Sequence, residues 1–96
     1  MNRKTVIDEL ARRAGLGPSE ARRAVRALFG TAPGDGLIAD ALDRGERIVL
    51  TGFGTFRPRV RDERRVKDPR DGSWRTIPAA RVVAFRAGVA LKDRLR

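Results

Sequence analysis

Residues 51–77 read TGFGTFRPRVRDERRVKDPRDGSWRTI, and their strand and turn patterns are the clearest indication of the architecture. From Thr55 onward, apolar residues and arginines alternate, which places the two kinds of side chain on opposite faces of an extended strand. The apolar positions are Phe56, Pro58 and Val60, and the arginines are Arg57, Arg59 and Arg61. Because proline cannot donate a hydrogen bond to a neighbouring strand, Pro58 predicts an edge strand or a bulge.

After residue 61 the chain becomes charged and poor in apolar side chains. The sequence DPRDG at 68–72 has the composition of a tight turn, with Gly72 able to adopt a positive φ. Strand character returns over residues 76–85, so we expect a hairpin with its tip near residues 69–72. Its outer part, residues 61–75, has too few apolar side chains to pack on a core. This part is therefore expected to protrude as an arm.

Helical patterning dominates the first 45 residues. Apolar residues recur at helical spacing after Asn2, an expected N-cap, and the pattern stops at Gly15. A second helix is expected from Pro18, an interruption at the sequence GTAPGDG over 30–36, and a shorter helix up to Gly45. Sheet residues are expected at 46–60 and 76–85, and a final helix at 86–96. A chain of 96 residues predicts a single domain.

The charge balance indicates the class of partner. The chain has 22 lysines and arginines against 12 acidic residues, a formal net charge of +10. Such an excess favours DNA, RNA or an acidic membrane surface, and 41% hydrophobic residues can still build a core. A basic cluster alone is a weak motif. A solvated loop in which Asp62, Glu63, Asp68 and Asp71 pair with neighbouring cations is an equal alternative for the arm.

Several functions are excluded by missing residue types. The chain has no cysteine, histidine or tyrosine, which removes disulfides, thiolate metal sites and the commonest general base. We therefore expect no enzyme activity, no metal and no cofactor. The charged N-terminus lacks an apolar segment of a secretion signal, and no stretch approaches a spanning helix. These features predict a cytoplasmic location without a membrane partner.

Four motifs resemble one known family over nearly the whole chain. They are IDELARRAGL at 7–16, GFGTF at 52–56, IPAARV at 77–82 and AFRAGVALKD at 84–93. Together they are similar to the HU and integration host factor family of bacterial histone-like DNA-bending proteins. The resemblance implies an α+β fold: a helical dimerisation body, a three-stranded antiparallel β-sheet saddle and a protruding β-ribbon arm. It also implies a nucleoid-associated dimer that bends, wraps or compacts double-stranded DNA through the minor groove, largely without sequence specificity.

The resemblance and the hairpin together give the expected DNA-binding residues. On the arm these are Arg59, Arg61, Arg64, Arg65, Lys67, Arg70 and Arg75. Pro69 at the tip matches a proline that wedges between base pairs, as minor-groove architectural proteins do. On the body, Arg3, Arg86 and Lys92 match basic positions that can touch phosphates. The glycines and phenylalanines of GFGTF match turn and core positions instead. A homodimer is the simpler assumption, and a heterodimer stays open.

Two departures from the family pattern stand out. Asp68 places a carboxylate at the tip where the family usually has an uncharged amide, which is expected to weaken phosphate binding unless Arg65 or Arg70 neutralises it. The TAPGDG sequence breaks what is usually one long second helix.

Other nucleic-acid functions remain as alternatives. A sequence-preferring bending protein similar to integration host factor is the nearest, and an RNA-binding module is less favoured because the arm offers no aromatic platform before Trp74. Trp74 itself either stacks on a base or covers the apolar side of the arm, and we favour the packing role. No small-molecule substrate is expected.

Overall fold

The computed structural model describes residues 1–96. Their contacts divide into two compact units, Met1–Arg44 and Gly45–Arg96, where the sequence predicted one domain. The first is helical, and the second contains every strand and the last helix.

Three helices form the first unit: α1 (Arg3–Ala14), α2 (Pro18–Phe29) and α3 (Leu37–Asp43). As expected, Asn2 caps α1: its Oδ1 accepts the Thr5 N–H at 3.0 Å, while Thr5 Oγ1 accepts the Asn2 N–H at 2.8 Å. Gly15 ends this helix with φ 67°. These caps satisfy backbone groups that a helix leaves open at its ends, so local sequence sets the bounds of α1.

The core of the helical unit is small. Its fully buried apolar residues are Ala21, Val25 and Ala41. Larger apolar side chains stay in solvent: Leu28 is 40% exposed, Phe29 52% and Leu37 59%. Apolar side chains left in solvent on so short a chain favour association with a partner that covers them.

The interruption between α2 and α3 is a closed, hydrogen-bonded loop. The Asp35 N–H donates to the Ala32 carbonyl at 2.9 Å, and the Gly34 N–H donates to Asp40 Oδ1 at 3.1 Å. A Cβ added to Gly36 would overlap the carbonyl oxygen of Gly30. The two glycines therefore bring the start and the end of the loop into backbone contact, which no larger residue at position 36 would allow.

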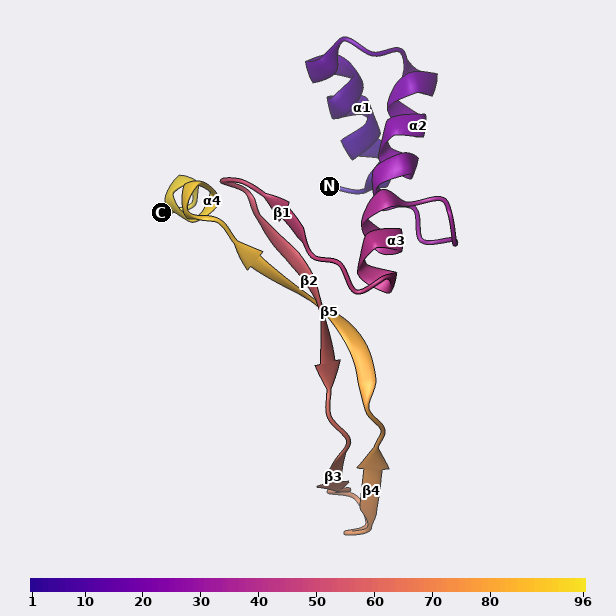
Figure 1. Ribbon diagram of the computed structural model, residues 1–96, viewed down its shortest axis with the longest axis vertical. Helices are drawn as coiled ribbons and strands as arrows, with labels where there is room; N and C mark the ends of the chain where they lie inside the picture. Colours follow the sequence, from indigo (N-terminus) through magenta and orange to yellow (C-terminus); the bar gives the residue numbers. More distant parts are fainter. The chain divides into compact units, whose positions relative to one another are not determined.

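Five strands and one helix form the second unit (Figure 1). Strands β1 (Ile48–Leu50), β2 (Gly54–Arg61) and β5 (Ala80–Ala87) make an antiparallel sheet in the order β1-β2-β5. Strands β3 (Arg64–Lys67) and β4 (Trp74–Ile77) make a separate two-stranded ribbon, and α4 (Val89–Arg94) follows β5. The expected α+β class, with a three-stranded antiparallel sheet and a β-ribbon arm, is confirmed.

The sheet and the ribbon are successive parts of one long hairpin. In the sheet Gly54 lies opposite Ala87 and Arg61 opposite Ala80, and in the ribbon Arg64 lies opposite Ile77. Two residues on each side, 62–63 and 78–79, separate the two ladders, so the register continues unchanged across the break. Pro78 lacks the N–H that a continuous ladder would need there. Figure 1 shows the ribbon reaching away from the end of the sheet that carries α4.

Two expectations about the bounds of elements are corrected. The strand expected over 76–85 is divided into β4 and β5 by Pro78 and Ala79. The final helix begins at Val89 rather than at residue 86, so Arg86 belongs to β5. The reason is Gly88, whose extended backbone (φ −76°, ψ 166°) ends the strand and caps the helix.

The prediction that Pro58 marks an edge strand or a bulge is wrong. Pro58 lies in β2, the middle strand, opposite Val83 in a regular register. Proline is tolerated there because β1 pairs with β2 only between Gly54 and Phe56. Beyond Phe56, the side of β2 that faces away from β5 has no neighbouring strand, so no backbone N–H is needed there. Pro58 therefore occupies a local edge position, although β2 is the middle strand of the sheet.

The backbone contact at Gly36 predicts the effect of adding one methyl group. Gly36→Ala should destabilise the protein by about 3 kcal/mol, because the Cβ collides with backbone that cannot move aside. The measurement is thermal unfolding followed by circular dichroism at fixed protein concentration. Gly17→Ala is the control, since its Cβ meets only the flexible Glu20 carboxylate, and it should cost at most about 1 kcal/mol. Equal melting temperatures for the two variants would contradict a tight closure.

Candidate nucleic-acid interface

Strand pairing sorts the side chains of the sheet onto two faces of different chemistry. Directly paired residues of antiparallel strands point to the same face, and successive residues alternate. One face is mainly apolar and carries Ile48, Leu50, Phe56, Pro58, Val83 and Phe85, with Val60 and Arg81 paired toward its far end. The other face is basic and carries Arg57, Arg59, Arg61 and Arg86. We call these the apolar face and the basic face.

The apolar face is only partly covered. Phe85 contacts Phe56 at 4.8 Å and Phe53 at 5.9 Å between ring centroids, which forms a small aromatic cluster. Even so, Phe85 is 46% exposed, Val83 59% and Leu50 43%. Apolar residues grouped at this exposure mark an interaction surface rather than scattered surface residues.

The basic face is open and uncompensated. Each arginine of β2 lies opposite a small or branched residue of β5: Arg57 opposite Ala84, Arg59 opposite Val82, and Arg61 opposite Ala80. None of these arginines forms an ion pair, and all are exposed. Small neighbours leave the guanidinium groups uncovered, so the face offers positive charge with rigid spacing to a polyanion.

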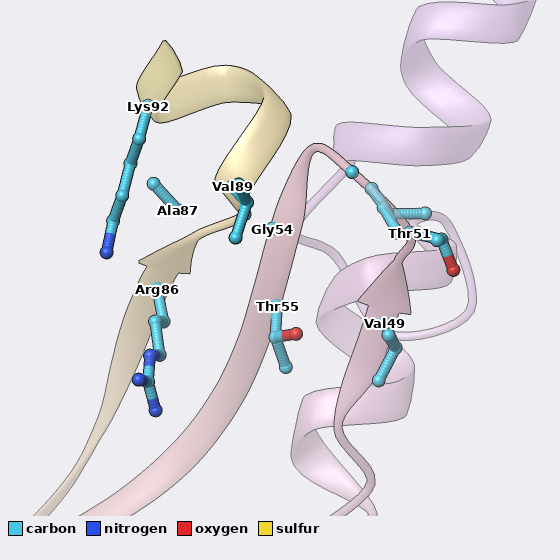
Figure 2. Close-up of a pocket in the computed structure, with 11 residues that line it drawn as sticks. Val49, Thr51, Gly54, Thr55, Arg86, Ala87, Val89 and Lys92 are labelled. Atoms are coloured by element: carbon cyan, nitrogen blue, oxygen red, sulfur yellow. The ribbon is translucent and has the colours of Figure 1, made fainter.

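A second pair of cations lies where β5 meets α4. The N–H groups of Gly88 and Leu91 donate to the carbonyls of Phe53 at 2.8 Å and Gly52 at 3.1 Å, which ties α4 to the turn before β2. The result is a hollow of about 360 Å³ whose lining includes Arg86 and Lys92. Figure 2 shows these two side chains along one side of the hollow, one from the strand and one from the helix.

The ribbon carries its cations on both faces. Arg65, Lys67 and Trp74 share one face, where the Arg65 guanidinium lies 5.4 Å from the centroid of the Trp74 ring. Arg64 and Arg75 share the other face with Val66 and Ile77. Trp74 remains 59% exposed, so it covers no apolar core, and its ring is partly covered by Arg65 instead.

The tip is built on two aspartates. The Asp68 N–H donates to the Ser73 carbonyl at 2.7 Å, and the Gly72 N–H donates to the Asp68 carbonyl at 2.9 Å, with Gly72 at φ 75°. Asp68 Oδ1 accepts the Arg70 N–H at 2.9 Å. Asp71 Oδ1 accepts the Ser73 hydroxyl and N–H, and these two bonds lower the pKa of Asp71. The turn expected near residues 69–72 is thus held by side chains as well as by backbone.

Asp68 is neutralised, but only partly as expected. Its carboxylate lies 3.6 Å from Arg70 Nε and 3.4 Å from Arg75 Nε. Arg65, the other expected partner, is engaged with Trp74. Asp62 and Glu63 form no ion pair. The alternative of a self-paired, solvated arm therefore describes the tip and not the rest of the hairpin.

The expected DNA-binding residues fall into separate groups. Arg59 and Arg61 share the basic face with Arg86, and Arg86 shares the hollow with Lys92. Pro69 is exposed at the tip, and Arg3 begins α1 in the other unit. The sequence-based set omitted Arg57, which the structure places in line with Arg59. The same alternation that selected Arg59 and Arg61 includes it, and could have found it.

No group of three or more acidic, cysteine or histidine side chains gathers in a way that could hold a metal ion. None of the helices has both the length and the apolar character to cross a membrane.

Comparison with known proteins gives concordant matches. The family model described as bacterial DNA-binding protein matches residues 1–96. The chain is 38% identical to DNA-binding protein HU of Geobacillus stearothermophilus and 40% identical to that of Staphylococcus aureus, in both cases over 100% of each chain. Its structure is similar to Anabaena HU in a cocrystal with DNA, with a TM-score of 0.84 and 30% identity over 99% of this chain and 97% of that one. HU from Thermotoga maritima gives a TM-score of 0.65 at 26% identity, with both chains covered completely.

The contact between Arg65 and Trp74 predicts a fluorescence change. Trp74 is the single tryptophan, so its emission reports on the ribbon alone. Arg65→Ala should uncover the indole ring and increase its quenching by acrylamide, because the guanidinium no longer covers one side of the ring. Arg64→Ala removes the same charge from the opposite face and should leave quenching unchanged. Equal quenching of the two variants would show that the contact is not populated.

Proposed function

The chain belongs to the family of bacterial DNA-binding proteins, and on this premise we propose that it is an architectural protein that binds and bends duplex DNA. It would act as a structural component of the bacterial nucleoid, in the cytoplasm, and not as an enzyme. The observation that carries the proposal is the basic face with its rigid row of unpaired arginines, continued by the ribbon.

Charge and shape favour the minor groove of a duplex as the target. Arginine forks donate to phosphates and to base acceptors together, and a narrow groove strengthens the negative potential that attracts them. A two-stranded ribbon is long and thin enough to follow such a groove. The proposed contacts on it are Arg57, Arg59, Arg61, Arg64, Arg65 and Lys67, with Pro69 as an apolar wedge at the tip. Arg70 and Arg75, which the sequence also placed at the interface, are left out of this set, since both pair with Asp68.

The remaining cations extend the interface. Arg86 and Lys92 line one hollow beside the basic face, and two cations that line the same hollow suit a phosphate group. Arg3, at the first turn of α1, would add a contact from the helical unit. Phosphate contacts of this kind fix the position of a protein on DNA without reading its sequence.

A second copy of the chain is the proposed partner for the apolar surfaces. The helical unit leaves Leu28, Phe29 and Leu37 exposed, and the sheet leaves Phe85 and Val83 exposed. A homodimer would bury these residues and supply the core that the single chain lacks. It would also provide two ribbons, one for each side of a duplex.

Duplex DNA is favoured over RNA by the composition of the ribbon. Single-stranded RNA is usually held by several exposed aromatic rings that stack on bases. Here Trp74 is the only aromatic residue of the ribbon, and Arg65 lies over it. Arginines that enter the minor groove meet a pattern of acceptors that is nearly the same for different base pairs, which favours binding largely independent of sequence.

The basic face predicts how binding depends on salt. Affinity for a mixed-sequence duplex should fall steeply as salt rises, because each phosphate contact releases counterions. Arg59→Ala combined with Arg61→Ala should make the slope of log affinity against log salt shallower by about 3.6, because the two ribbons of the proposed dimer lose four contacts at roughly 0.9 each. Fluorescence anisotropy with a labelled duplex gives both slopes.

The matched control removes two exposed arginines elsewhere. Arg22→Ala combined with Arg23→Ala changes the net charge equally on α2 and should leave most of the slope in place. A wild-type protein whose binding ignores salt, or a control that matches the Arg59 and Arg61 variant, would refute the proposed interface.

The wedge role of Pro69 predicts a separation of bending from affinity. Pro69→Ala removes the rigid ring and should reduce the bend angle of an end-labelled duplex, measured by energy transfer, while affinity changes by less than about threefold, since phosphate contacts supply most of it. Pro33→Ala, in the loop between α2 and α3, is the control and should bend DNA as the wild type does. An unchanged angle for Pro69→Ala would rule out the wedge.

A further inference from the structure

Asp68 is the only buried charged or polar residue of the protein, although it lies at the end of an exposed hairpin. Its side chain is 8% exposed, because the turn folds around it. Its carboxylate meets three groups: the Arg70 N–H, Arg70 Nε and Arg75 Nε. Its backbone contributes two further hydrogen bonds, to Ser73 and from Gly72. One residue therefore joins both strands of the tip.

These contacts divide the hairpin into two electrostatic regions. The tip, residues 68–75, contains two carboxylates and two guanidinium groups, and its formal charge is zero. The shank, residues 57–67, contains six cations and two acidic residues, and its formal charge is +4. The two arginines of the tip are the ones held by Asp68, whereas Arg57, Arg59, Arg61 and Arg64 of the shank have no acidic partner.

We propose that Asp68 is a positioning residue that locks the turn and withholds Arg70 and Arg75 from DNA phosphates, so that the tip meets the duplex as a preformed, charge-neutral element. The inference rests on the proposed function and deepens it, since it assigns charge-dependent binding to the shank and shape-dependent contact to the tip. A neutral tip can approach base pairs without first exchanging phosphate contacts, and a locked turn avoids the entropy loss of ordering on DNA.

The two roles of Asp68 can be separated by two substitutions. Asp68→Asn keeps an oxygen that accepts the Arg70 N–H but removes the charge that holds the two guanidinium groups. Asp68→Ala removes both. Asp62→Asn is the matched control, because it deletes one negative charge from the same hairpin without releasing any paired arginine.

The first measurement is the salt dependence of duplex binding. Asp68→Asn should give a slope of log affinity against log salt that is steeper than that of Asp62→Asn by about 1.8 to 3.6, as one or two arginines on each ribbon of the proposed dimer become available to phosphates. Equal slopes for these variants would overturn the withholding of Arg70 and Arg75. Failure of the wild type to bind duplex DNA at low salt is a different result, because it would overturn the proposed function itself.

The second measurement needs no DNA. Amide hydrogen exchange of Arg70 should be about fivefold faster in Asp68→Ala than in the wild type, as expected from the loss of one hydrogen bond, and close to wild type in Asp68→Asn. Unchanged exchange in Asp68→Ala would overturn the positioning role. This outcome is independent of whether the chain binds DNA, so the failure of the inference and the failure of the function can be told apart.

Discussion

The register between β2 and β5 is the constraint on which the rest of the second unit depends. Because Gly54 lies opposite Ala87 and the side chains alternate from there, every arginine of β2 lies on one face and every apolar residue on the other. A shift by a single residue would exchange the two faces and bury the arginines. The same register passes through the break at residues 62–63 and 78–79 and determines that Arg65, rather than Arg64, lies beside Trp74. The aromatic cluster around Phe85 favours this register, since it groups Phe53 and Phe56 on the apolar face.

Alternation and turn chemistry made much of this predictable from sequence. The period of two in TFRPRVR determined the faces of β2, and DPRDG marked the turn, since both are local signals that need no knowledge of distant contacts. The ends of elements were less predictable. Nothing local distinguishes Arg86 as strand from Arg86 as helix, and the outcome depends on hydrogen bonds from Gly88 and Leu91 to a turn more than thirty residues earlier. Pro58 misled for a related reason, because its tolerance depends on how far β1 extends along β2.

The candidate site shows the same division. Sequence identified the cations of the hairpin, but not which of them are free. Arg70 and Arg75 differ from Arg59 and Arg61 only in their proximity to Asp68, a property that depends on the folding of the turn. The exposed apolar residues of the helical unit and of the sheet indicate a second kind of interaction surface. With Ala21, Val25 and Ala41 as its buried apolar residues, the chain has charge arranged for one partner and apolar surface arranged for another. The proposed dimer interface and the proposed DNA interface thus lie on different faces and share no residues.

Gly30 and Gly36 are in backbone contact, so the length of the loop between them does not affect the geometry of the residues around it. Since the chain leaves and returns at the same point, the five residues between them form a side excursion whose size has no bearing on where α3 begins. Insertions at solvent-exposed excursions of this kind are tolerated well. A peptide tag or a fluorescent label placed at Pro33 would therefore leave both the helices and the arginine-bearing hairpin in their native form, and evolution has the same freedom to lengthen or decorate the protein at this position.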